Sequence, residues 1–312
     1  RNMEGTGYVY ITGGTNKLTG AGKAWTVGRL ENAYAEVSGT GVLDCSVSPM
    51  YIAPSWAGGM RYAEFHLRTG GTFIGTVVNN NNGGGGKFVF DGGTFVPTAA
   101  DPLTGSDQVY VAEGGVVVDT QARDVSISYA LQAYVEQPGG LVKLGTGSLT
   151  LSGANAYAGP TIVSNGTLTV ASAASLPNYD RPGYVTVCAG AALVLGAGWT
   201  DAQKAALRAA ITVEEGGSFG DPQTFDTPTA DVVDGASYAN PDGGAKTGAY
   251  ALTLTGANDF GGRFTVKAGT LAAAFGAGLG ARDNLRLAGG QFAGWYGLVD
   301  QAQGTGAGQI AF

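Results

Sequence analysis

Short stretches in which apolar and polar side chains alternate recur along the chain, and each follows a glycine-rich turn. In the stretch 62–68, Phe65 and Leu67 fall on one face, whereas the charged and polar side chains fall on the other. The same two-residue period recurs at 87–91 and at 125–128. A period of two is typical of β-strands that bury one face. The pattern therefore predicts many short strands separated by glycine turns.

These turns form a repeat. Glycine recurs at one position of the turn in steps of twenty-odd residues, at Gly71, Gly93, Gly115, Gly140, Gly166, Gly190 and Gly217. Repeats of this length indicate a solenoid, in which each unit buries its apolar face against its neighbours. The strand lengths favour a coil of parallel strands, two or three to a rung. A β-sandwich is the competing fold, but it gives no reason for a regular long-range repeat.

Two longer segments of the chain are copies of one another. Residues 153–159 align without a gap with residues 256–262, and the strands before and after them align at the same constant offset. We interpret this as an internal duplication of 145–171 and 248–274. Residues 1–312 are then a single β-solenoid segment, which we expect to be part of a longer chain.

One helix and three loops interrupt the repeat. Thr200 can cap a helix over 201–211, and Gln203 completes a capping box with it. The helix is expected to be an insertion that packs on the side of the coil. Three stretches rich in turn residues are predicted to protrude as loops, namely 79–86, 97–107 and 220–244.

Composition and charge narrow the possible partners. The 312 residues include 55 glycines, only 13% are charged, and the formal net charge is −7. No basic stripe occurs, which argues against nucleic acid as a partner. No apolar run approaches the ~20 residues of a membrane helix, so this segment is not expected to insert into a membrane. Cys45 and Cys188 lie about six rungs apart, at ~4.8 Å per strand, too far for a disulfide.

Residues with catalytic potential are sparse. A glycosidase needs two carboxylates across a cleft, and a lyase needs a base with cationic support. No such set repeats at one strand position, so no catalytic or cofactor-binding residue is assigned and no enzyme is predicted. The single histidine, His66, lies on the polar face of its strand and is expected to be solvated. A metal site would need further ligands, and no second histidine exists.

An acidic stretch follows the helix. No lysine or arginine occurs between Arg208 and Lys246. Carboxylates without a counter-charge can supply oxygen ligands for Ca²⁺, although their spacing matches neither an EF-hand loop nor the nonapeptide calcium repeat. The alternative is a solvated loop that repels its neighbours. The calcium candidates are Asp221, Asp226, Asp231 and Asp234, with Glu214, Glu215 and Asp242 nearby.

The duplicated blocks carry a family resemblance. Residues 145–168 resemble the autotransporter-associated β-strand repeat, also called the passenger-associated transport repeat. The second copy departs from the pattern at Tyr250 and Arg263. The resemblance implies an all-β, right-handed parallel β-helix (β-solenoid) from a secreted protein of the bacterial cell surface. It supplies no catalytic motif.

We therefore predict a non-catalytic extracellular structural protein, a rigid rod that serves as stalk, fibre or surface coat. Its expected partners are other copies of itself or further repeats of the same chain, stacked end to end. The alternative is an adhesin or glycan-binding module that uses the loops. In that case surface glycans are the partners, and Trp25, Trp56, Trp199 and Trp295 are candidates for stacking on sugars. A polysaccharide lyase or glycosidase is the third reading.

Overall fold

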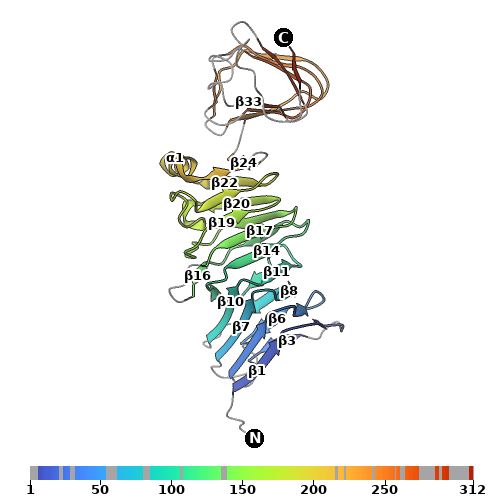
Figure 1. The fold of residues 1–312 in the computed structure, drawn as a ribbon, viewed down its shortest axis with the longest axis vertical. Helices are drawn as coiled ribbons and strands as arrows, with labels where there is room; N and C mark the ends of the chain where they lie inside the picture. The colour runs from blue at the N-terminus through green and yellow to red at the C-terminus, as the bar shows by residue number, and fades with distance from the viewer. Residues whose placement is uncertain are drawn as a thin grey trace. The chain divides into compact units, whose positions relative to one another are not determined.

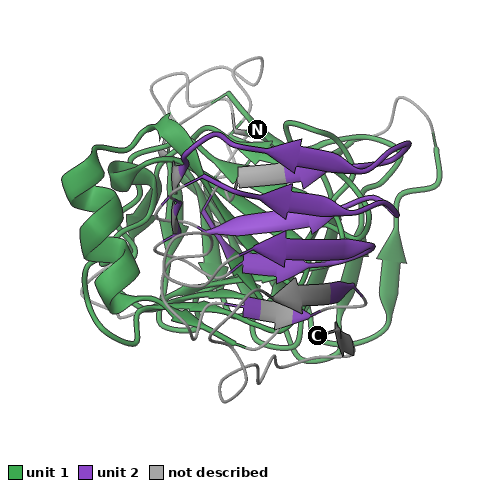
Figure 2. Ribbon diagram, turned by 90° about the horizontal axis from the view of Figure 1, so that it is seen from above, with its two compact units in different colours: residues 1–218 green, residues 219–312 purple. Residues whose placement is uncertain are grey.

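The protein consists of two compact units, Arg1–Ser218 and Phe219–Phe312, shown in green and purple in Figure 2. One copy of the duplicated segment lies in each unit. The computed structural model describes residues 6–20, 24–28, 32–53, 62–79, 85–105, 108–134, 139–214, 217–220, 223–240, 243–256, 258–260, 264–273, 285–287, 290–294 and 309–311.

Unit 1 is a stack of parallel strands (Figure 1). Sheet A contains β1 (Thr6–Ile11), β4 (Asn32–Val37), β7 (Tyr62–Arg68), β10 (Gly85–Asp91), β13 (Val109–Val111) and β16 (Leu131–Ala133). Sheet B contains β2 (Thr15–Lys17), β5 (Val42–Asp44), β8 (Thr72–Gly75), β11 (Thr94–Pro97), β14 (Val116–Asp119), β17 (Leu141–Leu144), β19 (Thr161–Val163), β21 (Val185–Val187) and β23 (Thr212–Val213). Sheet C contains β3 (Trp25–Val27), β6 (Met50–Ile52), β9 (Val77–Asn79) and β12 (Leu103–Thr104). Sheet D contains β15 (Val125–Ile127), β18 (Ser148–Leu151), β20 (Thr167–Ser172), β22 (Ala192–Gly198) and β24 (Ser218–Phe219).

Unit 2 has the same construction. Sheet E contains β25 (Gln223–Asp226), β28 (Gly244–Thr247), β31 (Phe264–Val266) and β33 (Leu285–Leu287). Sheet F contains β26 (Val232–Asp234), β29 (Leu252–Leu254), β32 (Thr270–Ala273), β34 (Gln291–Gly294) and β35 (Gln309–Ala311). A two-stranded sheet pairs β27 (Ala239–Asn240) with β30 (Asp259–Phe260).

The order of the strands confirms a parallel β-solenoid. The nine strands of sheet B are consecutive neighbours in space although they are spread over the whole unit in sequence. Between them the chain visits sheet A, sheet C or sheet D, so each rung contributes two or three strands. The predicted architecture, a coil that grows by stacking rungs on rungs, is therefore correct for the described strands of unit 1.

The interior is filled by columns of apolar side chains. Phe65 and Leu67 are fully buried, as predicted, but burial does not alternate along this strand, because Glu64 and His66 of the outer face are buried as well. Around Phe65 lies a group that we call the phenylalanine cluster. Its rings are in contact with one another, and its members are Phe65, Phe73, Phe88, Phe90 and Phe95.

The glycine turns are required by two separate constraints. Gly70 has a φ of +81°, a left-handed conformation that favours glycine. Gly71 approaches the preceding rung so closely that a Cβ there would overlap the backbone of Val37. One glycine thus makes the bend and the next allows the rungs to approach, which explains why glycine pairs recur at the turns.

We expect Gly71→Ala to lower the free energy of unfolding by about 1–3 kcal/mol, because the added methyl group must push two rungs apart. Gly7→Ala is the matched control, since a Cβ at Gly7 meets no atom within 4 Å. Urea unfolding followed by circular dichroism measures both changes. Equal stability of the two variants would contradict this explanation of the turn.

The helix is where the sequence predicts it. α1 covers Asp201–Ala210, and Thr200 and Gln203 form the capping box. A 3₁₀ turn, η2, covers Ala173–Ser175. No described helix is long and apolar enough to cross a membrane.

Two of the three predicted loops contain strands. The stretch 220–244 contains β25, β26 and β27, so the prediction of one protruding loop is wrong. Its strands pair in parallel with β28, β29 and β30, and Phe225 of β25 packs on Phe264 at a ring distance of 5.9 Å. The stretch 97–107 contains β12. Within 79–86, residues 80–84 lie outside the described residues.

Both cysteines are free, as the rung count predicts. Cys45 is buried and Cys188 is half-buried. Cys45 directly follows β5, and Cys188 directly follows β21. These strands are the second and the eighth of sheet B, so six rungs separate the two thiols.

Candidate functional site

Sheet A carries a polar, aromatic outer face that contrasts with its apolar inner face. Strand register places its side chains in columns that run from rung to rung. Tyr8, Tyr34, Glu64 and Lys87 form one such column. We call this surface the tyrosine face. It consists of Tyr8, Tyr10, Tyr34, Glu36, Tyr62, Glu64, His66, Arg68, Lys87, Asp91, Tyr110 and Tyr134.

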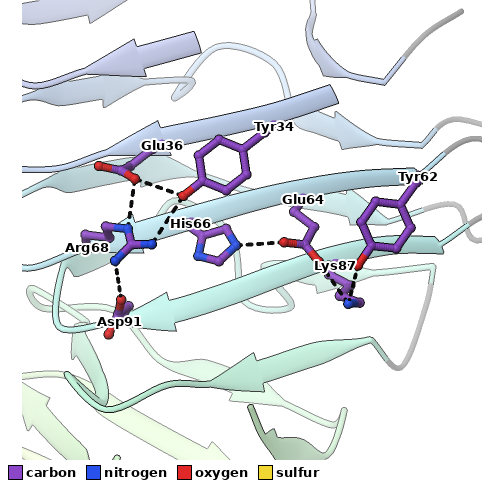
Figure 3. Close-up of polar contacts among 8 residues, drawn as sticks. All are labelled: Tyr34, Glu36, Tyr62, Glu64, His66, Arg68, Lys87 and Asp91. Atoms are coloured by element: carbon purple, nitrogen blue, oxygen red, sulfur yellow. Dashed lines mark hydrogen bonds and ion pairs between the residues drawn. The ribbon is translucent and has the colours of Figure 1, made fainter. Parts of the chain in front are cut away.

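One ionic group on this face is centred on Arg68 (Figure 3). Its guanidinium lies 2.8 Å from Glu36 and 3.0 Å from Asp91, and it donates to the hydroxyl of Tyr34 at 3.3 Å. Arg68 lies on β7 and its partners come from β4 and β10, so the group ties three successive rungs together. The pKa of Tyr34 is raised to about 12, chiefly by burial.

A second group is centred on Glu64 (Figure 3). Its carboxylate accepts from Lys87 Nζ at 2.8 Å, from Tyr62 Oη at 2.6 Å and from His66 Nε2 at 3.0 Å. Burial alone would raise the pKa of Glu64, but these three donors together lower it to about 2. Glu64 is therefore ionised at neutral pH and acts as an acceptor.

The prediction that His66 is solvated is wrong. Only 4% of the residue is exposed, because the rings of Tyr34 and Tyr134 lie 4.8 and 5.7 Å from its own. Burial lowers the pKa of His66, although the neighbouring carboxylate of Glu64 opposes this shift. The neutral ring donates from Nε2 to Glu64. Its Nδ1 is buried and has no hydrogen-bond partner in the described structure.

Lys87 is enclosed by aromatic rings. Its ammonium lies 4.9 Å from the ring centre of Tyr62 and 5.8 Å from those of Tyr110 and Tyr134. Cation–π attraction adds to its ion pair with Glu64, and the pKa of Lys87 is raised despite partial burial. The tyrosine face is thus an internally paired surface with phenol rings around it.

We expect Glu64→Gln to lower the free energy of unfolding by about 1–3 kcal/mol at pH 7, because hydrogen bonds to a charged group are lost. Glu64 has a pKa below the ~4.3 of an unfolded glutamate, so its contribution is complete above that value and disappears as pH falls through about 2. The stability gap between native protein and variant should therefore narrow on acidification. The exposed Glu113→Gln is the control; a gap independent of pH would contradict the network.

The acidic stretch is largely engaged in local hydrogen bonds. Asp226 accepts from Thr247 Oγ1 at 3.0 Å, and Asp231 accepts from the Ala251 amide at 2.8 Å. Asp234 accepts from the Ala236 amide and from Tyr238 Oη. No group of three or more metal-ligating side chains occurs among the described residues. Asp221, Asp242 and Glu215 lie outside them, and calcium binding stays a prediction.

The two tryptophans that lie in the described residues do not form an exposed aromatic surface. Trp199 is buried, donates from Nε1 to the Val170 carbonyl at 3.0 Å and packs on Tyr179. Trp25 is half-buried at the start of β3. Trp56 and Trp295 lie outside the described residues. Among the described residues the exposed rings are tyrosines, which the sequence pattern did not single out as candidates.

The duplicated segments share a feature that the sequence reading also missed. Lys143 is fully buried and points into the coil, in register with Val118 and Val163. Its ammonium donates to the carbonyls of Leu144 and Gly145 at 2.9 Å and of Asn165 at 3.0 Å. It thereby joins the turns of two successive rungs. We call this arrangement a lysine clamp.

The second copy repeats the clamp. Lys246 is also fully buried, and it donates to the carbonyls of Thr247, Gly248 and Ala268 at 2.8, 2.9 and 3.1 Å. Burial lowers the pKa of Lys143 to about 8, and the nearby charge of Asp119 opposes this. At pH 7 the Lys143 ammonium is still protonated, so it has three protons for three acceptors.

A neighbouring pair differs between the copies. Tyr157 is buried, and its hydroxyl lies 2.7 Å from Thr161 Oγ1. The aligned residues of the second copy are Phe260 and Phe264, whose rings pack at 5.1 Å. A hydrogen-bonded pair in one copy is thus replaced by an apolar pair in the other, and both members change together. The duplication is therefore visible in the packing as well as in the sequence.

Comparison with known proteins identifies these copies. Residues 141–170 and 245–273 match the passenger-associated-transport-repeat family. Neither a curated protein sequence nor a solved structure is significantly similar to the chain. The chain therefore contains two passenger-associated transport repeats, each built around a lysine clamp, within parallel β-solenoid units.

Proposed function

We propose that the chain is a structural segment of a secreted or surface-exposed bacterial protein, in which stacked rungs form a stiff spacer. The observation that carries this proposal is the match of two segments to a transport repeat of passengers, in a chain of stacked parallel strands. Each rung contacts mainly its neighbours, so the coil can fold progressively from one end. A lysine clamp closes as soon as the turn of the next rung arrives.

Surface display of the chain tests this role. The chain is fused to the membrane anchor of a passenger-exporting bacterium, and intact cells are treated with trypsin. We expect the native chain to reach the surface in a trypsin-resistant form. Retention inside the cell, or rapid cleavage throughout the chain at the surface, would contradict a stiff exported spacer.

We also propose that the coil stacks end to end on another copy. β1 is the outermost described strand of sheet A. Its inward-facing Val9 is 43% exposed, whereas inward side chains of the following rungs are buried. An exposed strand edge of this kind is a template for further strand pairing.

Val9→Lys is expected to abolish this assembly, because a charge at an edge strand blocks pairing. Sedimentation velocity over a range of protein concentrations measures it: the native chain should form larger species and the variant should remain the smallest species. Val47→Lys is the matched control, since Val47 is 50% exposed but lies outside the strands. Concentration-independent sedimentation of the native chain would contradict the proposal.

A polysaccharide-cleaving activity finds no support in the tyrosine face. A glycosidase needs a carboxylic acid that donates a proton near neutral pH, whereas Glu64 has a pKa of about 2. His66 is buried, and its Nε2 already faces Glu64. The geometry of this face favours binding over proton transfer.

A further inference from the structure

We propose that the tyrosine face binds an extended, neutral saccharide chain. Tyr8, Tyr10 and Tyr62 would provide the stacking surface, and the Glu64–His66 pair would provide the polar centre. This inference specifies a site for the glycan-binding alternative, away from the loops and tryptophans considered above. It does not rest on the structural role.

The stacking surface is unusually open for aromatic side chains. Tyr8 and Tyr10 are 62% and 58% exposed, and Tyr62 is 49% exposed. The rings of Tyr8 and Tyr10 are parallel, at an interplanar angle of 1° and a centroid distance of 6.4 Å. Both also approach Tyr34, at 6.1 and 5.9 Å. Phenol rings with an apolar body and a polar tip suit a ligand that has apolar C–H faces and hydroxyl edges.

The polar centre contains a buried acceptor without a partner. His66 Nε2 is directed to Glu64, which leaves Nδ1 as an acceptor that no described group satisfies. An unpaired buried polar atom costs about 1–3 kcal/mol. A hydroxyl donor that reaches Nδ1 when a neighbouring ring turns aside would remove this cost. A saccharide supplies such donors along its whole length.

Charge and spacing favour a neutral, linear polymer. Glu36, Glu64 and Asp91 face Arg68 and Lys87, and every one of these charges is paired. With His66 neutral, the face carries no excess positive charge that would attract a polyanion. Its columns advance from rung to rung at the strand spacing of ~4.8 Å, so a linear polymer that follows the stack would meet a phenol or a polar group at each rung from β1 to β10. A peptide would instead be expected to pair with a strand edge.

Affinity electrophoresis of the purified chain tests the proposal. The gels contain a soluble neutral glucan, mannan or galactan, or a polyuronate as the anionic probe. We expect at least one neutral polymer to retard the chain, and Tyr8→Ala/Tyr10→Ala to weaken binding at least tenfold. Both tyrosines are exposed, so circular dichroism should remain native. Tyr250→Ala, which changes an exposed tyrosine of unit 2, is the matched control and should bind as the native chain does.

The single histidine gives a second readout. Because the chain contains one histidine, ¹⁵N NMR of the imidazole reports on His66 alone. We expect the Nδ1 resonance to shift on saturation with the retarding polymer's oligosaccharide. The proposal is overturned if no neutral polymer retards the chain, if only the polyuronate does, if the double tyrosine variant binds normally, or if Nδ1 does not respond. None of these outcomes bears on the surface-display test of the structural role.

Discussion

Lys143→Met is expected to lower the free energy of unfolding of unit 1 by about 2–4 kcal/mol. Methionine retains the apolar stem but removes the ammonium that donates to the carbonyls of Gly145 and Asn165, and a hydrogen bond from a charged group contributes about 1.5–3 kcal/mol. The Leu144 carbonyl loses less, because it also accepts from the Thr120 amide at 3.1 Å and from Thr120 Oγ1. The variant also loses the link between two successive turns. Urea unfolding at pH 7 measures the change.

Three comparisons sharpen this experiment. Lys246→Met should have a similar effect in unit 2, and the two effects should add, because the clamps share no acceptor. Lys204→Met on α1 is the control, since that lysine is partly exposed and its ion pair with Asp201 has a long separation of 4.0 Å. Equal stability of Lys143→Met and Lys204→Met would show that the clamp contributes nothing.

The pH dependence of the clamp has a defined sign. Burial lowers the pKa of Lys143 to about 8, below the ~10.4 of an unfolded lysine. Between these values the unfolded chain binds more protons than the folded chain, so stability rises with pH. The advantage of the native protein over Lys143→Met should therefore grow from pH 8 to pH 10.

The parts of the fold that the sequence predicts are those set by local sterics. The left-handed turn at Gly70 demands glycine from the local backbone alone. The close approach at Gly71 involves the preceding rung, but it also demands glycine, so the recurring glycine pairs show the rung period in the sequence. The capping box of α1 involves only Thr200 and Gln203, three positions apart. Alternation of side chains along one strand is equally local. These features need no knowledge of which rung lies on which.

The parts that escape prediction depend on contacts between rungs. His66 alternates as a surface residue should, but Tyr34 and Tyr134 cover it from other rungs. The stretch 220–244 has the composition of a loop, yet Phe225 anchors a strand there against residues far along the chain. Rungs differ in length, so the register that unites these residues cannot be read from a periodic pattern alone.

The buried position of Lys143 was not predicted for a different reason. In the strand 141–144 it shares its face with the buried Leu141, so alternation does place it inside the coil. A reading that assigns every lysine to solvent overlooks this. Lys246 occupies the aligned position of the second copy. A lysine that recurs at an inward position in both copies indicates that each has hydrogen-bond acceptors inside the coil.

The largest loss of packing is expected for Phe88→Ala. Phe88 is fully buried, and its ring centre lies 4.6 Å from that of Phe90, 5.3 Å from that of Phe65, and 6.1 Å from those of Phe73 and Phe95. Removing the ring leaves a cavity at the centre of the phenylalanine cluster, which should cost about 3–5 kcal/mol. Phe88→Leu retains most of the volume and should cost less than about 1.5 kcal/mol.

The site at which Phe88→Ala loses stability distinguishes a solenoid, whose rungs unfold locally, from a globule that unfolds cooperatively. Because each rung is stabilised mainly by its neighbours, hydrogen exchange in Phe88→Ala should accelerate in β7, β8, β10 and β11. It should remain unchanged in β28 and β31 of unit 2, whose own core surrounds Phe264. A uniform acceleration across both units would mean that the chain unfolds as one cooperative body, and the rung-by-rung folding on which the proposed function depends would then fail.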